Sequence, residues 1–278
     1  MNRFFTVLRS AAMAFAILAV AQYTWGALLI ANLKTTTLIP WATPVMLAAL
    51  WVMWRFLSAT PTRRHLLRSR PVPAAQVTWT FAAGALSVIS LAGLWIVFFQ
   101  LFKMTPNLIP GAENCPWWTG LAMAITGSLV SPLSEEAGFR GYCQSTLERV
   151  FPGSTAVMIS SILFAIAHLN HGFFVPKLLV YFLFGMVMGG LAYVNRSILP
   201  GIPVHSFGDM VFFIMVWRYD GGRSLVWSAG ADSWFWIHVA QTIVFGVLSV
   251  MAFLKLRKVS SAPVMPAVAR LALGFQNA

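Results

Sequence analysis

Apolar residues follow one another along this chain in long blocks, and short polar segments separate the blocks. Each block is about as long as a helix that crosses a hydrocarbon core of roughly 30 Å, and too long for barrel strands of about ten residues. The pattern predicts an all-α polytopic membrane helix bundle with about eight transmembrane helices, at residues 10–32, 38–58, 77–102, 117–149, 154–171, 176–194, 200–217 and 234–254. We expect residues 1–278 to form one integral membrane domain, in which 255–278 are a short basic C-terminal tail.

The composition agrees with a membrane protein, since 59% of the residues are hydrophobic and 9% are charged, with a mean hydropathy of +0.76. A soluble domain of this size carries far more charge. The first residues resemble a signal peptide, because a basic segment precedes an apolar run and Ala19, Val20 and Ala21 mimic a cleavage site. The apolar run continues to about Ile30, however, which favours an uncleaved first helix.

With eight spans, both termini and every second loop lie on the same side of the membrane. Most of the 19 Lys and Arg residues fall in these segments. By the positive-inside rule this side is the cytoplasm, so we expect both termini to be cytoplasmic. We also expect the membrane to be a bacterial-type cell (inner) membrane. A basic face against anionic lipid headgroups accounts for the formal net charge of +12. We therefore expect a lipid bilayer and no nucleic acid among the partners.

Few polar side chains interrupt the predicted spans, because an Asp, Lys or Arg at mid-helix costs roughly 2.5–3.5 kcal/mol on insertion scales. Those that persist usually face a partner or a cavity. They are Glu135, Glu136 and Arg140 in the fourth span, His168 in the fifth, His205 and Asp209 in the seventh, and His238 in the eighth. We expect all except His238, which fits an interfacial polar group, to mark a functional site.

The fourth span contains two carboxylates with different surroundings. Glu136 and Arg140 lie four residues apart on one helix face and can form an ion pair, whereas Glu135 is turned about 100° away. Glu135 is thus the natural general base, since a partly desolvated carboxylate can accept and return a proton near neutral pH. Pro132 removes a helix hydrogen bond just before these residues, which predicts a kink.

Two further pairs have the same spacing of four residues, Phe164 with His168 and His205 with Asp209. At 1.5 Å per residue, Glu136, His168 and Asp209 all lie about 20 Å from the predicted cytoplasmic ends of their helices. Independent helices thus place polar groups at a similar depth. We therefore expect one buried site, open toward the cytoplasm.

The order of the motifs resembles that of the CPBP or Abi family, which includes the type II CAAX prenyl endopeptidases. These motifs are EExxxR at 135–140, FxxxH at 164–168 and HxxxD at 205–209, and GFRGY at 138–142 and TLERVF at 146–151 are also similar to the family. Three motifs in order within membrane spans are fairly specific. The resemblance covers about residues 117–217 and implies a catalytic core there, with the activity of a glutamate-type intramembrane endopeptidase.

Carried over by position, the resemblance implies that Glu135 and His168 activate a water for attack on a peptide carbonyl. His205 and Asp209 would then hydrogen-bond the developing oxyanion. An Asn at position 209 would donate through its amide, but Asp donates only when protonated. Either Asp209 is protonated, or it orients His205 instead.

The same resemblance gives Glu136, Arg140 and Phe164 a supporting role in the site. The expected substrate is a membrane-anchored peptide or protein, lipidated or with a C-terminal tail. A metalloprotease could ligate zinc with His168, His205 and a carboxylate, but HExxH is absent and a metal-free mechanism uses the same residues. We therefore expect no cofactor and no metal.

Other functions remain open on the residues alone. Buried charges also form proton relays, so a proton-coupled transporter or a non-enzymatic membrane scaffold is the main alternative. An aspartyl protease would pair Asp209 with Asp220, which we expect in a loop, and a serine nucleophile has no GxSxG setting. Three other features have simpler explanations: His171 at a helix end needs only solvent, His65 in a basic loop likewise, and Gly185, Gly189 and Gly190 suit close helix packing.

Overall fold

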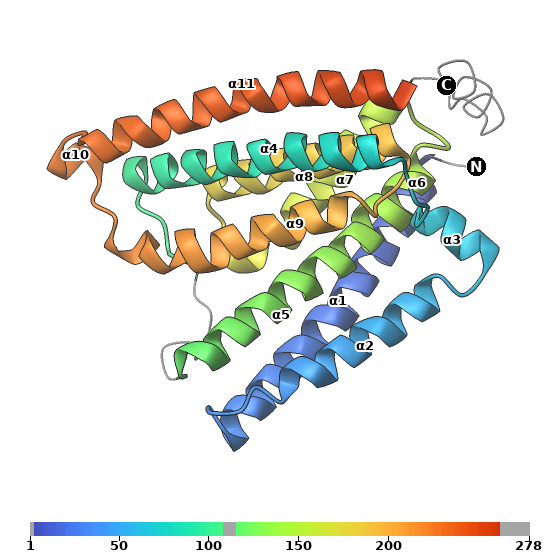
Figure 1. The fold of residues 1–278 in the computed structure, drawn as a ribbon, viewed down its shortest axis with the longest axis horizontal. Coiled ribbons are helices and arrows are strands. Elements are labelled where there is room, and N and C mark those ends of the chain that lie inside the picture. Colours follow the sequence, from blue (N-terminus) through green and yellow to red (C-terminus); the bar gives the residue numbers. More distant parts are fainter. Residues whose placement is uncertain (1–2, 108–114, 262–278) are drawn as a thin grey trace, which may run out of the picture.

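The computed structural model describes residues 3–107 and 115–261, and every regular element within these ranges is helical (Figure 1). The longer helices are α1 (Arg3–Thr35), α2 (Ala42–Leu57), α4 (Ala74–Leu101), α5 (Trp117–Glu135), α7 (Gly153–Ala167), α8 (Val175–Asn195) and α11 (Ser233–Ser261). The shorter elements are α3 (Pro61–Leu67), η2 (Glu136–Cys143), α6 (Gln144–Leu147), η3 (Leu169–His171), α9 (Gly201–Met210), η4 (Val211–Val216), η5 (Trp217–Gly222) and α10 (Val226–Ala229). The predicted all-α polytopic bundle is confirmed.

The helices form two groups that are inclined to each other (Figure 1). In one group α4 packs along α11, and α7 pairs with α8. In the other group α1 contacts α2 and α5. Helix α9 contacts both α4 and α5, so it joins the two groups, and the polar residues of the predicted site lie on the elements around this junction.

Within the described ranges four helices are long and apolar enough to cross a membrane, namely α1, α4, α8 and α11. Helices α2 and α3 would together provide a fifth span, with a bend of 111° between them. The other predicted spans correspond to α5 with η2 and α6, to α7, and to α9 with η4, which are shorter or more polar, and the motif residues lie on these elements or directly beside them. The membrane-spanning character therefore holds, and the number of eight spans stays a prediction.

The basic loop at 59–74 contains a short helix, α3, that the hydrophobic pattern did not reveal. The Thr60 side chain accepts a hydrogen bond from the Arg63 amide at 3.2 Å, Pro61 opens the helix, and Arg68 ends it with a left-handed φ of 55°. An N-cap threonine followed by proline is a recognised start signal. At the other end of the chain, α11 continues to Ser261, so the first residues of the predicted tail are helical, and residues 262–278 lie outside the described ranges.

Between α5 and α6 the chain forms a π-helix at Glu136–Cys143, where the sequence suggested a kinked α-helix. Two glycines of the GFRGY motif allow neighbouring backbones to approach it. A Cβ atom at Gly138 would lie 3.0 Å from the carbonyl oxygen of Ala14 in α1, and one at Gly141 would lie 3.2 Å from that of Leu67 in α3. The motif therefore docks the charged segment against α1 and α3.

Close packing of α7 on α8 depends on Gly185. A Cβ atom there would lie 3.0 Å from the Cα atom of Ser161, whereas at Gly190 on the same helix the nearest atom would be in the Phe253 ring at 3.6 Å, an ordinary contact. The Gly185 carbonyl also accepts a hydrogen bond from Arg140 at 3.4 Å. Gly185 thus links helix packing to the predicted site.

We expect Gly185→Ala to lower the free energy of unfolding by about 1–3 kcal/mol relative to Gly190→Ala, because overpacking forces the two backbones apart. Both changes gain the same helix propensity, about 1 kcal/mol, so Gly190→Ala is a matched control. Unfolding in mixed micelles titrated with sodium dodecyl sulfate measures the difference. Equal stabilities would mean that the α7–α8 contact relaxes without cost.

Candidate active site

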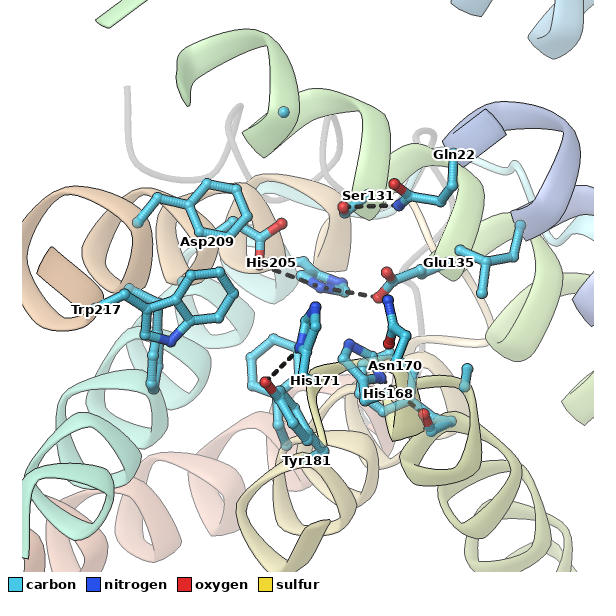
Figure 2. Close-up of a pocket in the computed structure, with 18 of the residues that line it drawn as sticks. Gln22, Ser131, Glu135, His168, Asn170, His171, Tyr181, His205, Asp209 and Trp217 are labelled. Atoms are coloured by element: carbon cyan, nitrogen blue, oxygen red, sulfur yellow. Dashed lines mark hydrogen bonds and ion pairs between the residues drawn. The ribbon is translucent and has the colours of Figure 1, made fainter. Parts of the chain in front are cut away.

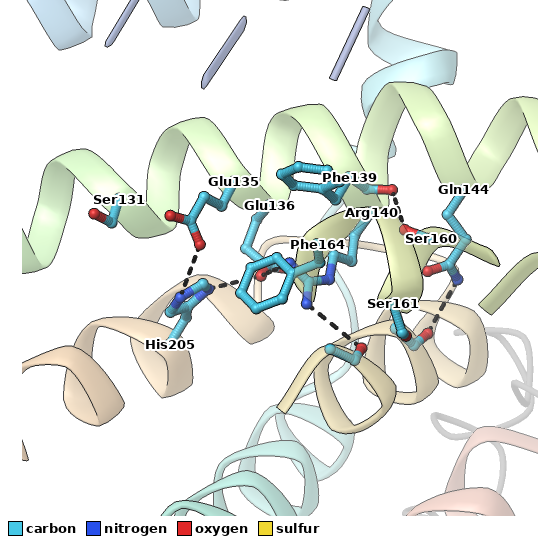
Figure 3. A network of polar contacts seen from close by, with 12 residues as sticks. Ser131, Glu135, Glu136, Phe139, Arg140, Gln144, Ser160, Ser161, Phe164 and His205 are labelled. Carbon is cyan, nitrogen blue, oxygen red and sulfur yellow. Dashed lines mark hydrogen bonds and ion pairs between the residues drawn. The ribbon is translucent and has the colours of Figure 1, made fainter. Parts of the chain in front are cut away.

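The three charged residues of the EExxxR motif lie inside the bundle, where α5 passes into η2 (Figure 3). The exposed fractions of Glu135, Glu136 and Arg140 are 4%, 0% and 1%. Taking an ion out of water costs several kcal/mol unless a partner compensates it. The contacts of these three side chains therefore decide whether this segment is stable.

Glu136 and Arg140 form the ion pair that their spacing predicts, with 3.2 Å between Oε1 and Nη1. The Arg140 guanidinium also lies 4.2 Å from the centroid of the Phe164 ring, a cation–π contact. Its Nη2 donates to the Gly185 carbonyl. Through these contacts Arg140 connects η2 with α7 and α8, and the supporting role of Phe164 stays a prediction.

His205 on α9 faces both glutamates of the motif (Figure 3). Its Nδ1 lies 2.8 Å from Glu136 Oε1, and because a carboxylate paired with Arg140 only accepts, Nδ1 carries the hydrogen. Its Nε2 lies 3.5 Å from Glu135 Oε2 and 3.7 Å from Asp209 Oδ1. Glu135 and Glu136 lie on different helix faces, yet both contact His205, each through a different ring nitrogen.

This cluster contains three carboxylates, one imidazole and one guanidinium. Arg140 balances one carboxylate, and an uncompensated buried charge is costly, so two further protons are needed for neutrality. The His205 imidazole can bind one, and Glu135 or Asp209 the other. Within the described residues, Glu135 Oε2 and Asp209 Oδ2 are buried without a hydrogen-bond partner, so both remain available to a water molecule or a substrate.

His168 follows the last residue of α7 and is half-buried. Its Nδ1 lies 2.8 Å from the Phe164 carbonyl oxygen. Because a carbonyl only accepts, Nδ1 carries the hydrogen and Nε2 keeps a lone pair. The ring stacks on Tyr181, with centroids 4.2 Å apart. His168 can therefore accept a hydrogen bond from a water molecule through Nε2.

The four predicted catalytic residues, Glu135, His168, His205 and Asp209, line one cavity of about 340 Å³ (Figure 2). The structure thus brings them together, while Glu136 and Arg140 lie outside the lining. The walls come from α1, α4, α5, α7, η3, α8, α9, η4 and η5 and are mainly apolar, with Leu18, Trp25, Leu29, Met123, Val180, Phe184, Phe212, Phe213 and Trp217 among the lining residues. A polar cluster therefore meets an apolar chamber.

Basic residues gather at one end of the bundle. Arg70 donates to the carbonyls of Asn195 and Arg196 at 3.1 and 2.9 Å, and Arg68 donates to Glu148 at 3.0 Å. The cavity is lined by the later half of α1, by α5 and by the first turns of α8, so it extends away from this end. The expected opening of the site toward the cytoplasm stays a prediction.

Several polar lining residues were not among the predicted site residues, and two of them are His171 and Gln22. His171 was expected to need only solvent, but it is half-buried, lines the cavity and has its Nδ1 2.7 Å from the Tyr181 hydroxyl. Gln22 also lines the cavity and donates to Ser131 at 2.9 Å. Gln22 could have been found from the sequence, because it is a polar residue that interrupts an apolar span. Nothing in the sequence distinguishes His171 from a surface histidine.

The alternative sites receive no support from the geometry. Asp220 lies in η5, outside the cavity lining, and accepts hydrogen bonds from Trp95 at 2.8 Å and from Arg223 at 3.0 Å. Burial raises the pKa of the Asp220 carboxyl, and these two hydrogen bonds oppose the rise. Ser134 donates to the Val130 carbonyl at 2.7 Å. Across residues 3–107 and 115–261, no group of three or more His, Cys, Asp or Glu has an arrangement that could hold a metal ion.

Comparison with known protein families gives one match. Residues 116–211 match the family described as type II CAAX prenyl endopeptidase Rce1-like. The match spans α5 to the start of η4 and includes all the motif residues. It confirms the resemblance seen in the sequence. Searches of curated proteins and of solved structures found no match.

We expect Arg140→Met to destabilise the protein by about 3–5 kcal/mol, because it leaves the buried Glu136 without its guanidinium partner. Arg9→Met is the matched control, since Arg9 is exposed on α1 and its replacement should change stability by about 0.5 kcal/mol or less. Thermal unfolding in detergent measures both variants. A small effect at position 140 would mean that His205 alone compensates the charge of Glu136.

Proposed function

We propose that the chain, whose residues 116–211 match the Rce1-like family of type II CAAX prenyl endopeptidases, is a membrane protease that hydrolyses its substrate with a water activated by Glu135 and His168. The substrate in this proposal is a membrane-anchored protein whose lipidated C-terminal tail enters the cavity. The observation that carries the proposal is the position of His205. Its Nδ1 is fixed by Glu136, and its Nε2 faces Glu135 and Asp209 at one end of an apolar cavity.

Water activation requires a proton acceptor and a group that orients the water. Glu135 has a buried carboxylate oxygen that lacks a hydrogen-bond partner in the described structure, so it can take the proton. His168 presents the lone pair of Nε2 to the same cavity, because its Nδ1 hydrogen is used by the Phe164 carbonyl. A water that donates one hydrogen to each residue would direct its oxygen at a peptide carbonyl carbon.

The oxyanion that forms needs hydrogen-bond donors. In the proposed state His205 is an imidazolium that donates through Nε2, and Asp209 carries the second proton required for a neutral cluster. Glu135 is then the free carboxylate. Asp209 would thus donate as an asparagine amide does, whereas Glu136 already orients His205 through Nδ1. When the intermediate collapses, Glu135 returns its proton to the leaving amine.

The cavity walls suit a lipidated tail. Leu18, Trp25 and Leu29 of α1 and Met123 of α5 provide an apolar surface that leads to the polar cluster. A prenylated cysteine followed by three residues has this mixture, with an apolar chain beside a short peptide. Burial of apolar surface contributes about 25 cal/mol per Å², so the lipid would supply much of the binding free energy.

We further propose that the protein lies in a bacterial-type inner membrane with both termini cytoplasmic. The start of α1 and the end of α11 lie at the same end of the bundle (Figure 1). Arg3 lies 5.6 Å from the Phe151 ring, which places the start of α1 beside the loop after α6. The basic residues Arg68, Arg70 and Arg196 lie at that end too, as expected for a cytoplasmic face.

We expect Glu135→Gln and His168→Ala to lower kcat by at least about 100-fold, because each removes a group that activates the water. The assay is cleavage of an internally quenched peptide, with farnesylated cysteine followed by three residues, by protein in proteoliposomes. Glu148→Gln is the matched control, because Glu148 binds Arg68 outside the cavity. Chelators such as 1,10-phenanthroline should leave the rate unchanged, since we propose no metal.

Folded Glu135→Gln protein that cleaves at the wild-type rate would refute the proposed mechanism. Proton-coupled uptake in the same vesicles that survives both changes would favour a transporter. If cleavage depends on Glu135, comparison of the membrane proteomes of wild-type and Glu135→Gln cells would identify the natural substrate.

Asp209 should tolerate Asn but not Ala. If the carboxyl acts as a protonated donor, Asp209→Asn keeps an N–H at the same place, whereas Asp209→Ala removes one oxyanion donor and should lower kcat by about 10²–10³-fold. An amide donates at every pH, but a carboxylic acid loses its hydrogen as the pH rises. The activity of the wild type relative to Asp209→Asn should therefore fall with rising pH, as pH–rate profiles would show. Equal losses for Asn and Ala would mean that Asp209 acts as a carboxylate.

A further inference from the structure

A chain of buried polar groups runs from α8 to the wall of the cavity. Lys177, which is 1% exposed, donates through Nζ to Asn107 Oδ1 at 2.7 Å. Asn107 Nδ2 donates to the Tyr181 hydroxyl at 2.9 Å, and this hydroxyl lies 2.7 Å from His171 Nδ1. The four side chains therefore connect a buried cation to a histidine that lines the cavity.

The donor and acceptor roles in this chain follow from its first member. An ammonium group has three donors and no acceptor. All three are used, since Lys177 also donates to the carbonyls of Thr105 and, at 3.1 Å, His171. Asn107 must therefore turn its oxygen to Lys177 and its NH₂ to Tyr181.

The donor and acceptor roles of Tyr181 and His171 follow from that of Asn107. The Tyr181 oxygen accepts from Asn107, so its own hydrogen is free to point at His171 Nδ1. His171 Nδ1 accepts this hydrogen, and the hydrogen of the neutral ring is on Nε2. The chain thus fixes His171 in the Nε2–H tautomer, while the carbonyl of Phe164 fixes His168 in the Nδ1–H tautomer.

Figure 2 shows that Nε2 of His171 points away from Tyr181 and into the cavity. The two histidine rings lie 5.5 Å apart between centroids, and Trp217 packs against His171 at 5.6 Å. One wall of the cavity therefore offers an acceptor from His168 and a donor from His171. The proposed water activation uses the acceptor and leaves the donor without a role.

We propose that His171 donates its Nε2 hydrogen to a backbone carbonyl oxygen of the bound peptide and is a substrate-binding residue of the site. Lys177, Asn107 and Tyr181 are positioning residues, because they act through the tautomer of His171. The inference rests on the proposed proteolytic function. It assigns His171 to the bound peptide and leaves the oxyanion to His205 and Asp209.

The tautomers can be read directly by NMR of the full-length protein in detergent with ¹⁵N-labelled histidine, without any substrate. We expect His171 to have its hydrogen on Nε2 and His168 on Nδ1. Tyr181→Phe keeps the aromatic ring and removes only the hydroxyl, so it should shift His171 toward a mixture of tautomers and leave His168 unchanged. A hydrogen on Nδ1 of His171 in the wild type would overturn the inference.

Kinetics test the contact with the peptide. His171→Phe should raise KM for the farnesylated quenched peptide by about 3- to 10-fold with little change in kcat. The change removes one neutral hydrogen bond that is made equally in the substrate complex and in the transition state. His171→Gln retains an N–H donor and should recover part of the loss. Tyr181→Phe should give a smaller rise in KM. His238→Phe is the matched control, because His238 binds Gln241 on α11 outside the cavity.

The outcomes separate the two proposals. If wild-type protein shows no cleavage that depends on Glu135, the proposed function fails, and the role of His171 fails with it. If cleavage depends on Glu135 but folded His171→Phe has the KM of the wild type, only the inference about His171 fails. A raised KM that His171→Gln does not relieve at all would show that the ring is needed for packing and not as a donor.

Discussion

The buried ion pair of Glu136 and Arg140 is the constraint on which the rest of the site depends. Two charges without water are stable only when further contacts compensate the desolvation. Arg140 obtains these from the Phe164 ring and the Gly185 carbonyl, and Glu136 obtains one from His205. The pair therefore holds η2 close to residues of α7, α8 and α9, which also contribute residues to the cavity lining.

His205 connects the buried ion pair of Glu136 and Arg140 with the other two carboxylates of the site. With Nδ1 committed to Glu136, the imidazole has one orientation, and Nε2 must face Glu135 and Asp209. Three carboxylates cannot share this space without protons, so the site is organised around a small number of mobile hydrogens. A polar cluster of this kind next to an apolar chamber suits hydrolysis of a bond whose flanking groups are lipid-like.

Much of this arrangement could be predicted from the sequence, because charged residues are rare in membrane helices and their spacing reports shared faces. The helical fold and the pairing of Glu136 with Arg140 follow from those two rules. Lys177 and His171 could not be placed in the same way. Lys177 lies close to a predicted span end, where exposure is the simpler expectation, and its burial depends on a loop 70 residues earlier in the chain. Contacts of that kind arise from tertiary packing and leave no periodic signal.

The π-helix at Glu136–Cys143 sets the register between the two halves of the fourth predicted span. A π-helical turn holds more residues than an α-helical turn. Residues before this segment and residues after it therefore do not follow one continuous α-helical periodicity. An α-helix of the same length would turn further than this π-helix and would rotate Glu135 relative to the residues beyond Cys143. The site would be lost although each of its side chains remained. The conformation of this segment is therefore as restricted as its composition.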